Sequence, residues 1–293
     1  MSLANKNNVY IVGELVEIKD FKNDVYGADS QNYVAATVVI KSMVDGQELL
    51  TEARTFISEY TSKKTVNKNY SVIKNIHNML NKKVVISGAQ LVSERFWSER
   101  TQQLANSTRI RFNLIRLARE TDEDRVTFEF SGFVTRPITE VLDEDGNVRY
   151  YQITLGQANY KEDNMFEVTF AVSKDNVKAY NVMDEKYVPG STVEVNGVCQ
   201  TIVTHIEKTE PVAFGDPIVK RFTNVDKKFI ITGGSDVISG EGEYLDDVIN
   251  RLIAAYKAEG TEIQNKASSQ KSSAATTTAA KPKSRASNLA GLI

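Results

Sequence analysis

The chain has little of what covalent cross-links, metal sites and membrane spans require. Its 293 residues include one cysteine, Cys199, so no internal disulfide can form, and only two histidines. Neither His77 nor His205 has a cysteine or carboxylate at metal-ligand spacing, and Cys199 falls in a predicted strand, as a buried inert thiol does. No apolar run approaches the roughly 20 residues of a membrane span. The N-terminal residues 1–6 lack a signal-peptide core, which predicts a cytoplasmic protein with no membrane contact.

Motifs that carry catalysis are also missing. No Gly-x-Ser-x-Gly nucleophile motif occurs, and the glycines at 233–242 lack the Gly-Lys-Ser/Thr ending of a phosphate loop. The acidic clusters at 122–124 and 143–145 fall in predicted loops, whereas a two-metal nuclease needs carboxylates that converge from strands. We therefore expect a protein that is not an enzyme and needs no cofactor.

Acidic residues are absent from the last part of the chain, and the charge is unevenly spread elsewhere. Residues 1–120 hold 17 Lys and Arg against 12 Asp and Glu, whereas residues 121–262 hold 14 against 26. Residues 263–293 hold five basic residues and no acidic one. Because attraction to phosphates needs cations, any nucleic-acid site is expected in the first part.

Two stretches with alternating apolar residues organise the chain. Residues 82–92 and 109–114 each read as a strand, and the alternation turns Arg109 and Arg111 away from the apolar side chains. The loop predicted between them holds Trp97, the only tryptophan. A basic strand face beside an aromatic loop is typical of proteins that bind single-stranded nucleic acid.

The same pattern recurs about a hundred residues later. Residues 191–198 repeat the strand at 82–92, and residues 128–132 repeat residues 9–13, each ending in glycine. A glycine inside a strand indicates a bulge or a sharp bend, as when one strand curls to pair with two others in a small barrel. The repeat predicts two domains of one fold in tandem.

The first domain, residues 1–120, reads as three strands, a helix and two strands. The predicted strands at 9–18, 32–41 and 47–57 precede a helix at 70–80, and this is the element order of the five-stranded OB-fold barrel. In the third strand, Arg54 and Phe56 share the face opposite Leu49, Ala53 and Ile57. They are expected as an exposed basic and aromatic pair.

The second domain, residues 121–240, repeats that order. We expect strands at 128–134, 137–142, 148–155, 165–172 and 227–232, a helix near 174–184, and a long loop at 207–225 with Pro211, Pro217 and a Lys220-Arg221-Phe222 cluster. An amphipathic helix within 241–262 is expected to end at Gly260. Residues 263–293, rich in Ser, Ala, Thr and Lys, are predicted to be a disordered basic tail.

The two glycine-centred strands support a family resemblance. The run from Lys83 to Trp97 resembles the corresponding segment of OB-fold single-stranded DNA-binding proteins, and residues 191–197 follow Pro189-Gly190 as in that family. The resemblance implies an all-β chain of two tandem OB-fold barrels from a bacterium or a phage-infected host, which coats and protects single-stranded DNA in replication, recombination or repair. It also implies replication or recombination proteins that dock on the tail, and it leaves a homo-oligomer open.

The residues expected to bind nucleic acid combine cations for phosphates with aromatic rings for bases. They are Arg54, Phe56, Tyr60, Lys63, Lys64, Arg95, Phe96, Trp97, Arg100, Arg109 and Arg111. Two alternatives stay open at this point. The barrels could serve as a scaffold in a virion or replisome, or they could bind RNA, because stacking does not distinguish the sugars.

Overall fold

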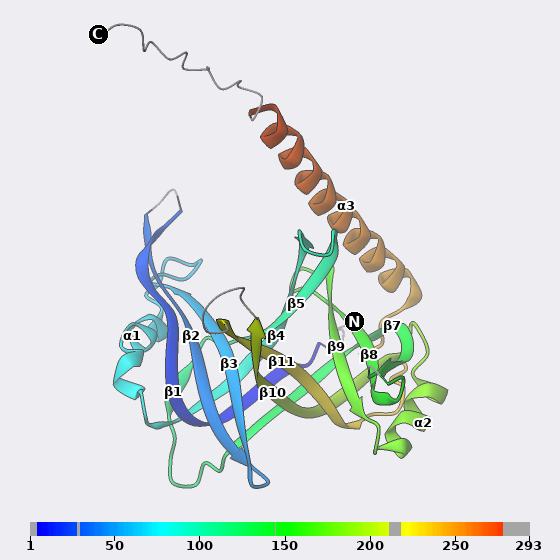
Figure 1. The fold of residues 1–293 in the computed structure, drawn as a ribbon, viewed down its shortest axis with the longest axis horizontal. Coiled ribbons are helices and arrows are strands. Elements are labelled where there is room, and N and C mark those ends of the chain that lie inside the picture. The colour runs from blue at the N-terminus through cyan, green and yellow to red at the C-terminus, as the bar shows by residue number, and fades with distance from the viewer. Residues whose placement is uncertain (1–4, 28–29, 144, 211–217, 278–293) are drawn as a thin grey trace, which may run out of the picture.

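A computed structural model describes the backbone of residues 5–27, 30–143, 145–210 and 218–277, and the side chains of these residues except for those at 201–227 and 270–277. Figure 1 shows two β-barrels side by side and a long C-terminal helix. The elements are β1 (Asn7–Tyr26), β2 (Gln31–Val44), β3 (Gln47–Ser58), α1 (Lys68–Lys74), the 3-10 helix η1 (Ile76–Met79), β4 (Lys83–Ser98), β5 (Gln103–Arg111), β6 (Ile115–Leu117), β7 (Arg125–Leu142), β8 (Val148–Ala158), β9 (Met165–Ser173), α2 (Val177–Lys186), β10 (Thr192–Glu210), β11 (Ile218–Gly234) and α3 (Asp246–Thr277).

Both barrels close with the strand order of the OB-fold. Barrel 1, formed by β1 to β6, pairs its strands in the order β1-β2-β3-β5-β4 and closes through β4 and β1. Barrel 2, formed by β7 to β11, uses the order β7-β8-β9-β11-β10 and closes through β10 and β7. In each barrel one pair is parallel, β3 with β5 and β9 with β11. The predicted fold of two tandem OB-fold barrels is confirmed.

The paired glycines mark the points where the first strand of each barrel bends. β1 pairs with β4 up to Glu14 and with β2 from Glu14 onward, next to Gly13, where a Cβ would lie 2.3 Å from the carbonyl oxygen of Lys41. At Gly132 a Cβ would lie 2.4 Å from the carbonyl oxygen of Gly156. Only glycine permits this approach. The predicted curling of one strand between two partners is confirmed, while the register shift in β1 falls two residues later, between Leu15 and Glu17.

The barrels share one hydrophobic core. Residues Asn7 to Val12 of β1 pair antiparallel with Arg125 to Phe130 of β7, so the sheet continues from one barrel into the other. Side chains that alternate inward along these strands, such as Ile11, Phe128 and Phe130, are fully buried in one cluster.

Several strands are longer than the alternation predicts, among them β4 and β7. β4 continues past Val92 to Ser98, so Trp97 lies in a strand instead of a loop. β7 continues through Pro137 to Leu142, because a register irregularity between Arg136 and Thr139 accommodates the missing donor. Hence residues 137–142 are not a separate strand.

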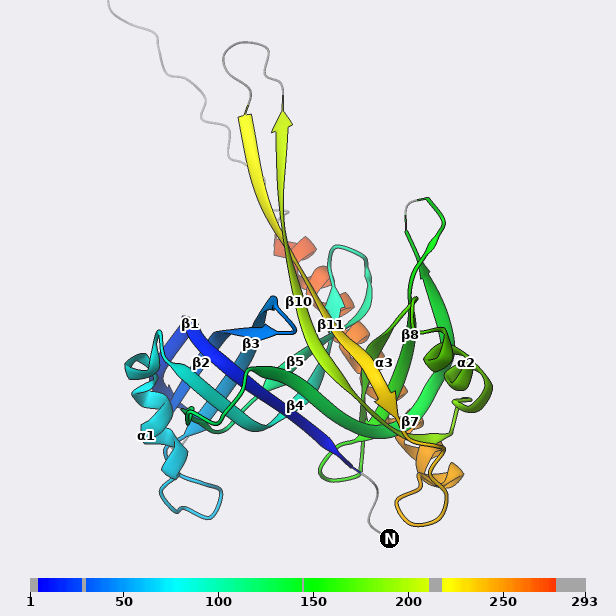
Figure 2. The ribbon, with the colours of Figure 1, turned by 90° about the horizontal axis from the view of Figure 1, so that it is seen from below.

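The prediction of a long loop at 207–225 is also wrong. β10 extends to Glu210 and β11 begins at Ile218, so the two strands form a long ribbon (Figure 2). Their backbones pair from Val195 and Gly234 to Glu210 and Ile218. Pro211 and Pro217 lie outside the described residues, and the side chains of the Lys220-Arg221-Phe222 cluster are not described.

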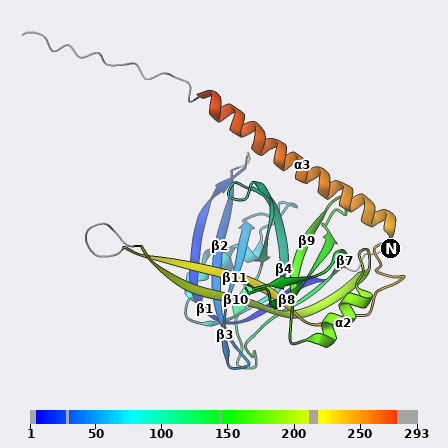
Figure 3. The same cartoon turned by 45° about the vertical axis from the view of Figure 1, so that its right-hand side comes forward.

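The C-terminal helix is longer than expected. α3 passes through Gly260, where the sequence predicts its end, and continues to Thr277 beyond the barrels (Figure 3). Residues 263–277, expected as part of a disordered tail, are therefore helical, and residues 278–293 lie outside the described part. Of the apolar residues in the predicted amphipathic segment, Ile249 and Leu252 are buried, while Leu245 precedes the helix and is exposed.

Candidate nucleic-acid interface

Three neighbouring cavities run from the face of barrel 1 to its contact with barrel 2. The first, of about 520 Å³, is lined by β3, β4 and β5. The second, of about 190 Å³, shares Arg54 and Arg109 with the first and adds Lys228 of β11. The third, of about 230 Å³, shares Thr108 and Lys228 with the second and reaches β8 and β9. Because adjacent cavities have residues in common, they form one continuous surface, which we call the inter-barrel groove.

The barrel 1 side of this groove is basic. Arg54 and Arg111 lie opposite each other in the parallel β3–β5 pair, and both side chains are exposed. Neither forms an ion pair with any residue that the structure describes. Arg109 lies two residues from Arg111 on the same face, but its Nη1 is 2.7 Å from Oε2 of Glu94. The alternation that predicted this basic face is confirmed by Ile110, which is buried between the two arginines.

An aromatic cluster adjoins these arginines. Phe56 is 39% exposed and stacks on Tyr33 of β2, with ring centroids 4.9 Å apart and an angle of 22° between the planes. Tyr26 of β1 meets both rings edge-on. An exposed ring held at a fixed angle by two neighbours is a rigid surface for stacking. Tyr33 could have been found from the sequence, because it lies opposite the inward-facing Val34 and Ala36; Tyr26 could not, because the predicted strand ends at Ile18.

The barrel 2 side of the groove is less basic and more polar. The Lys228 ammonium lies 4.4 Å from the ring centroid of Tyr150, a cation–π contact. Of the other polar groups in this cavity, Gln152, Glu167 and Thr169 come from barrel 2, and Asn106 and Thr108 face them from β5 of barrel 1. Cys199 lines the middle cavity and is buried, and burial raises the pKa of its thiol, so it stays neutral. Sequence reasoning missed Lys228 and Tyr150, since only the packing of two barrels brings them here.

The motif around Trp97 divides between two faces of β4. Phe96 is exposed and lies on the same face of β4 as Glu94, which lines the groove. Arg95 points the other way, to α3, where its Nη1 donates a 2.7 Å hydrogen bond to the carbonyl oxygen of Tyr256. Trp97 shares that face by alternation. It is half-buried, and its Nε1 has no hydrogen-bond partner among the described residues.

The remaining predicted residues lie outside the cavities of the groove. Tyr60, Lys63 and Lys64 occupy the exposed turn after β3, where Tyr60 bridges to Val66. Arg100 is exposed in the tight turn between β4 and β5. The structure thus brings together Arg54, Phe56, Arg109 and Arg111 in one cavity, and leaves the other predicted residues outside the cavities of the groove.

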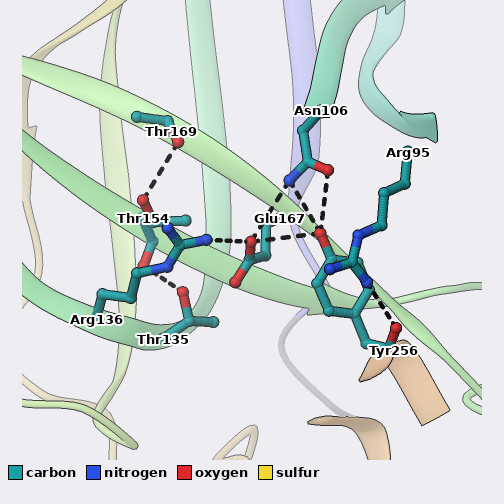
Figure 4. A network of polar contacts seen from close by, with 8 residues as sticks. All are labelled: Arg95, Asn106, Thr135, Arg136, Thr154, Glu167, Thr169 and Tyr256. Atoms are coloured by element: carbon teal, nitrogen blue, oxygen red, sulfur yellow. Dashed lines mark hydrogen bonds and ion pairs between the residues drawn. The ribbon is translucent and has the colours of Figure 1, made fainter. Parts of the chain in front are cut away.

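Polar contacts at one end of the groove join both barrels to α3 (Figure 4). The hydroxyl of Tyr256 lies 2.9 Å from Nδ2 of Asn106 on β5 and 3.3 Å from Oε2 of Glu167 on β9. Nη2 of Arg136 lies 2.5 Å from the same Glu167 oxygen. Burial and the nearby Glu167 carboxylate raise the pKa of Tyr256, so its hydroxyl stays protonated and able to donate.

No group of three His, Cys, Asp or Glu residues in the described part of the chain is arranged to hold a metal ion. Among the described helices, none combines the length and the apolar character needed to cross a membrane. The side chains that line the groove offer hydrogen bonds, cations and aromatic rings.

The fold and the groove define a tandem OB-fold protein. Residues 5–270 match the YorF family, and the chain belongs to that family. No curated protein matches the sequence.

Solved structures share this architecture at low sequence identity. A deletion mutant of the single-stranded DNA-binding protein from Thermus aquaticus is similar over 81% of this chain and 98% of its own, with a TM-score of 0.50 and 11% identity. The wild-type Thermus aquaticus protein is similar over 83% of this chain and 98% of its own, with a TM-score of 0.49 and 10% identity. A replication protein A heterotrimer bound to single-stranded DNA is similar over 89% of this chain and 54% of its own, with a TM-score of 0.25 and 11% identity. The first of these likenesses shows a shared fold.

Proposed function

We propose that this protein binds single-stranded DNA in the inter-barrel groove, without strong sequence preference. The observation that carries the proposal is the exposed ring of Phe56 beside Arg54 and Arg111, two cations without a carboxylate partner in the described chain. Every base has a face that can stack on such a ring, and every nucleotide has a phosphate for the arginines. The shared fold with a protein named for single-stranded DNA binding supports the same function.

The wider role follows from the family resemblance of the two glycine-centred strands. We propose a non-enzymatic protein that coats and protects single strands during replication, recombination or repair, in the cytoplasm of a bacterium or a phage-infected host. Replication or recombination proteins that dock on the tail, and a homo-oligomer, stay predictions. Residues 278–293 of that tail lie outside the described residues.

The test is a titration of the full chain with fluorescently labelled oligo-dT at two salt concentrations. Tight binding that weakens as salt rises is expected, since each phosphate contact contributes about 0.7 to the slope of log K against log salt. Oligo-U and duplex DNA of the same length are the controls. Equal affinity for oligo-U would extend the ligand to RNA, and no salt-dependent binding to any of the three would favour the scaffold.

A further inference from the structure

α3 contacts barrel 2 through an apolar face. Ile249 and Leu252 pack with Phe133 and Met165 in a small hydrophobic cluster separate from the main core. A side chain of this helix also touches the other barrel. Tyr256 packs against the edge of the same cluster and extends to barrel 1.

Three groups of Tyr256 take part in this bridge. Its ring lies under the Arg95 guanidinium, 4.1 Å from Cζ to the ring centroid, and its carbonyl oxygen accepts from the same arginine. Its hydroxyl contacts Asn106 of barrel 1 and Glu167 of barrel 2 (Figure 4). Gly260, one turn further along α3, leaves room for Arg95, because a Cβ there would lie 2.5 Å from its Nη1.

The bridge lies at the groove. Asn106 and Glu167 both line the third cavity, one from each barrel. Glu167 is 8% exposed and is fixed by Arg136, so it is a rigid anchor for the Tyr256 hydroxyl. The barrels are also joined by the pairing of β1 with β7 and by a contact between Asn106 and Glu167 themselves, 3.5 Å from Nδ2 to Oε2. The Tyr256 hydroxyl adds a contact to both residues and so restricts movement of β5 relative to β9.

We infer that Tyr256 is a positioning residue, which holds the two walls of the inter-barrel groove at the spacing that lets one nucleic-acid strand contact both barrels. The inference rests on the proposed function and adds a role for α3 to it. A preformed groove loses less freedom when a ligand binds, so the fixed spacing raises affinity. Only ligands long enough to reach both barrels gain from it.

The test compares Tyr256→Phe with the wild-type full chain on oligo-dT of two lengths. About 4 nucleotides suffice for one OB-fold and about 30 span two. Tyr256→Phe keeps the ring under Arg95 and removes the hydroxyl that contacts Asn106 and Glu167. The 30-mer should bind about fivefold more weakly, the value of one hydrogen bond, and affinity for the 4-mer at low salt should not change.

Glu259→Ala is the matched control. Its carboxylate accepts a 3.0 Å hydrogen bond from Asn164 of barrel 2, so its loss removes a contact of α3 that does not join the barrels. This variant should bind both oligonucleotides as the wild type does. Equal weakening of both lengths by Tyr256→Phe, no change, or tighter binding of the 30-mer would overturn the inference.

A second measurement does not depend on DNA. Asn113→Cys in barrel 1 and Lys174→Cys in barrel 2 place labels at exposed positions, while Cys199 is buried. Energy transfer between the labels should report a broader range of distances in Tyr256→Phe than in the parent. An unchanged distribution would show that α3 does not set the spacing. If the wild type binds neither oligonucleotide, the proposed function fails, and this readout still decides whether Tyr256 positions the barrels.

Discussion

Phe56 is an apolar side chain that the core does not use. Its neighbours Thr55 and Ile57 face the barrel interior and are buried, so alternation leaves Phe56 outside, next to Arg54. Tyr33 and Tyr26 hold its ring in place without covering it. Exposed aromatic groups of this kind mark interaction sites.

We therefore expect Phe56→Ala to weaken binding of oligo-dT by about 1–3 kcal/mol, the value of one base stacked on a ring. Thermal unfolding should change little, because the ring is largely outside the core. Tyr160→Ala is the control, since Tyr160 is a fully exposed aromatic residue outside the groove cavities. Equal losses of affinity in the two variants would contradict a specific platform at Phe56.

Trp97 gives the opposite expectation. It lies on the face of β4 from which Arg95 contacts α3, and it is half-buried. We expect Trp97→Ala to lower the free energy of unfolding by about 1–3 kcal/mol, less than a fully buried tryptophan would cost. Its effect on oligo-dT affinity should be smaller than that of Phe56→Ala. Urea unfolding measures the stability of Trp97→Ala, and titration of the same sample with oligo-dT measures its affinity. Lost affinity with unchanged stability would make Trp97 the stacking platform that the sequence suggests.

At the scale of elements, the acidic run after β6 anchors the connection between the barrels. Asp122 accepts from Arg116 at 2.9 Å and from the backbone N–H of Arg119 at 2.8 Å. Asp124 lies 2.7 Å from Nζ of Lys83. Two of the three acidic residues that the sequence places in a loop are thus bound to barrel 1 or its connection.

This anchoring makes stability depend on pH. The hydrogen bonds from Arg116 and then Arg119 lower the pKa of Asp122 from 3.8 to about 2. A carboxyl whose pKa is lower in the folded state stabilises it above pH 3.8, and this contribution disappears as the pH falls towards 2. Asp122→Asn should therefore be less stable than the wild type at pH 7, and the difference should shrink between about pH 4 and pH 2.

Urea unfolding at several pH values measures that difference. Glu123→Gln is the control, because Glu123 is exposed and has no ion pair with a described residue. A difference for Asp122→Asn that stays constant down to pH 2 would show that the carboxylate does not stabilise the fold.

The period of the apolar residues predicts which strand faces are buried in a core. It does not predict where an element ends when a contact with a distant segment determines the end. The alternation in β3 and β5 placed Arg54, Phe56, Arg109 and Arg111 correctly, because one face of each strand is buried. The end of α3 was predicted at Gly260 from local signals. A glycine in a helix costs up to about 1 kcal/mol, and here it makes room for Arg95 of another barrel, which no local pattern contains.

At the scale of the whole molecule, the two barrels have different charge and a common groove. The first 120 residues carry an excess of five positive charges, whereas residues 121–262 carry an excess of twelve negative ones. The basic wall of the groove comes from β3 and β5, and the opposite wall is mostly neutral and polar. A strand in the groove would therefore have its phosphates at barrel 1.

This arrangement predicts which cations contribute to the salt dependence of binding. Arg54→Gln with Arg111→Gln removes two groove cations, and if both contact phosphates the slope of log K against log salt should fall by about 1.4, at 0.7 each. Arg109 is left in place because its pairing with Glu94 would have to break first. The slope is measured by titrating oligo-dT at several salt concentrations with the full chain.

The control removes the same charge from the other barrel. Lys161 and Lys174 are exposed outside the groove cavities and have no ion pair with the described residues, so Lys161→Gln with Lys174→Gln changes the net charge equally. If binding depends only on net charge, both double variants flatten the slope alike, because the long-range field is the same. If phosphates lie along β3 and β5, the groove variant alone loses about 1.4. A slope that falls only in the barrel 2 variant would place the DNA on barrel 2, outside the groove.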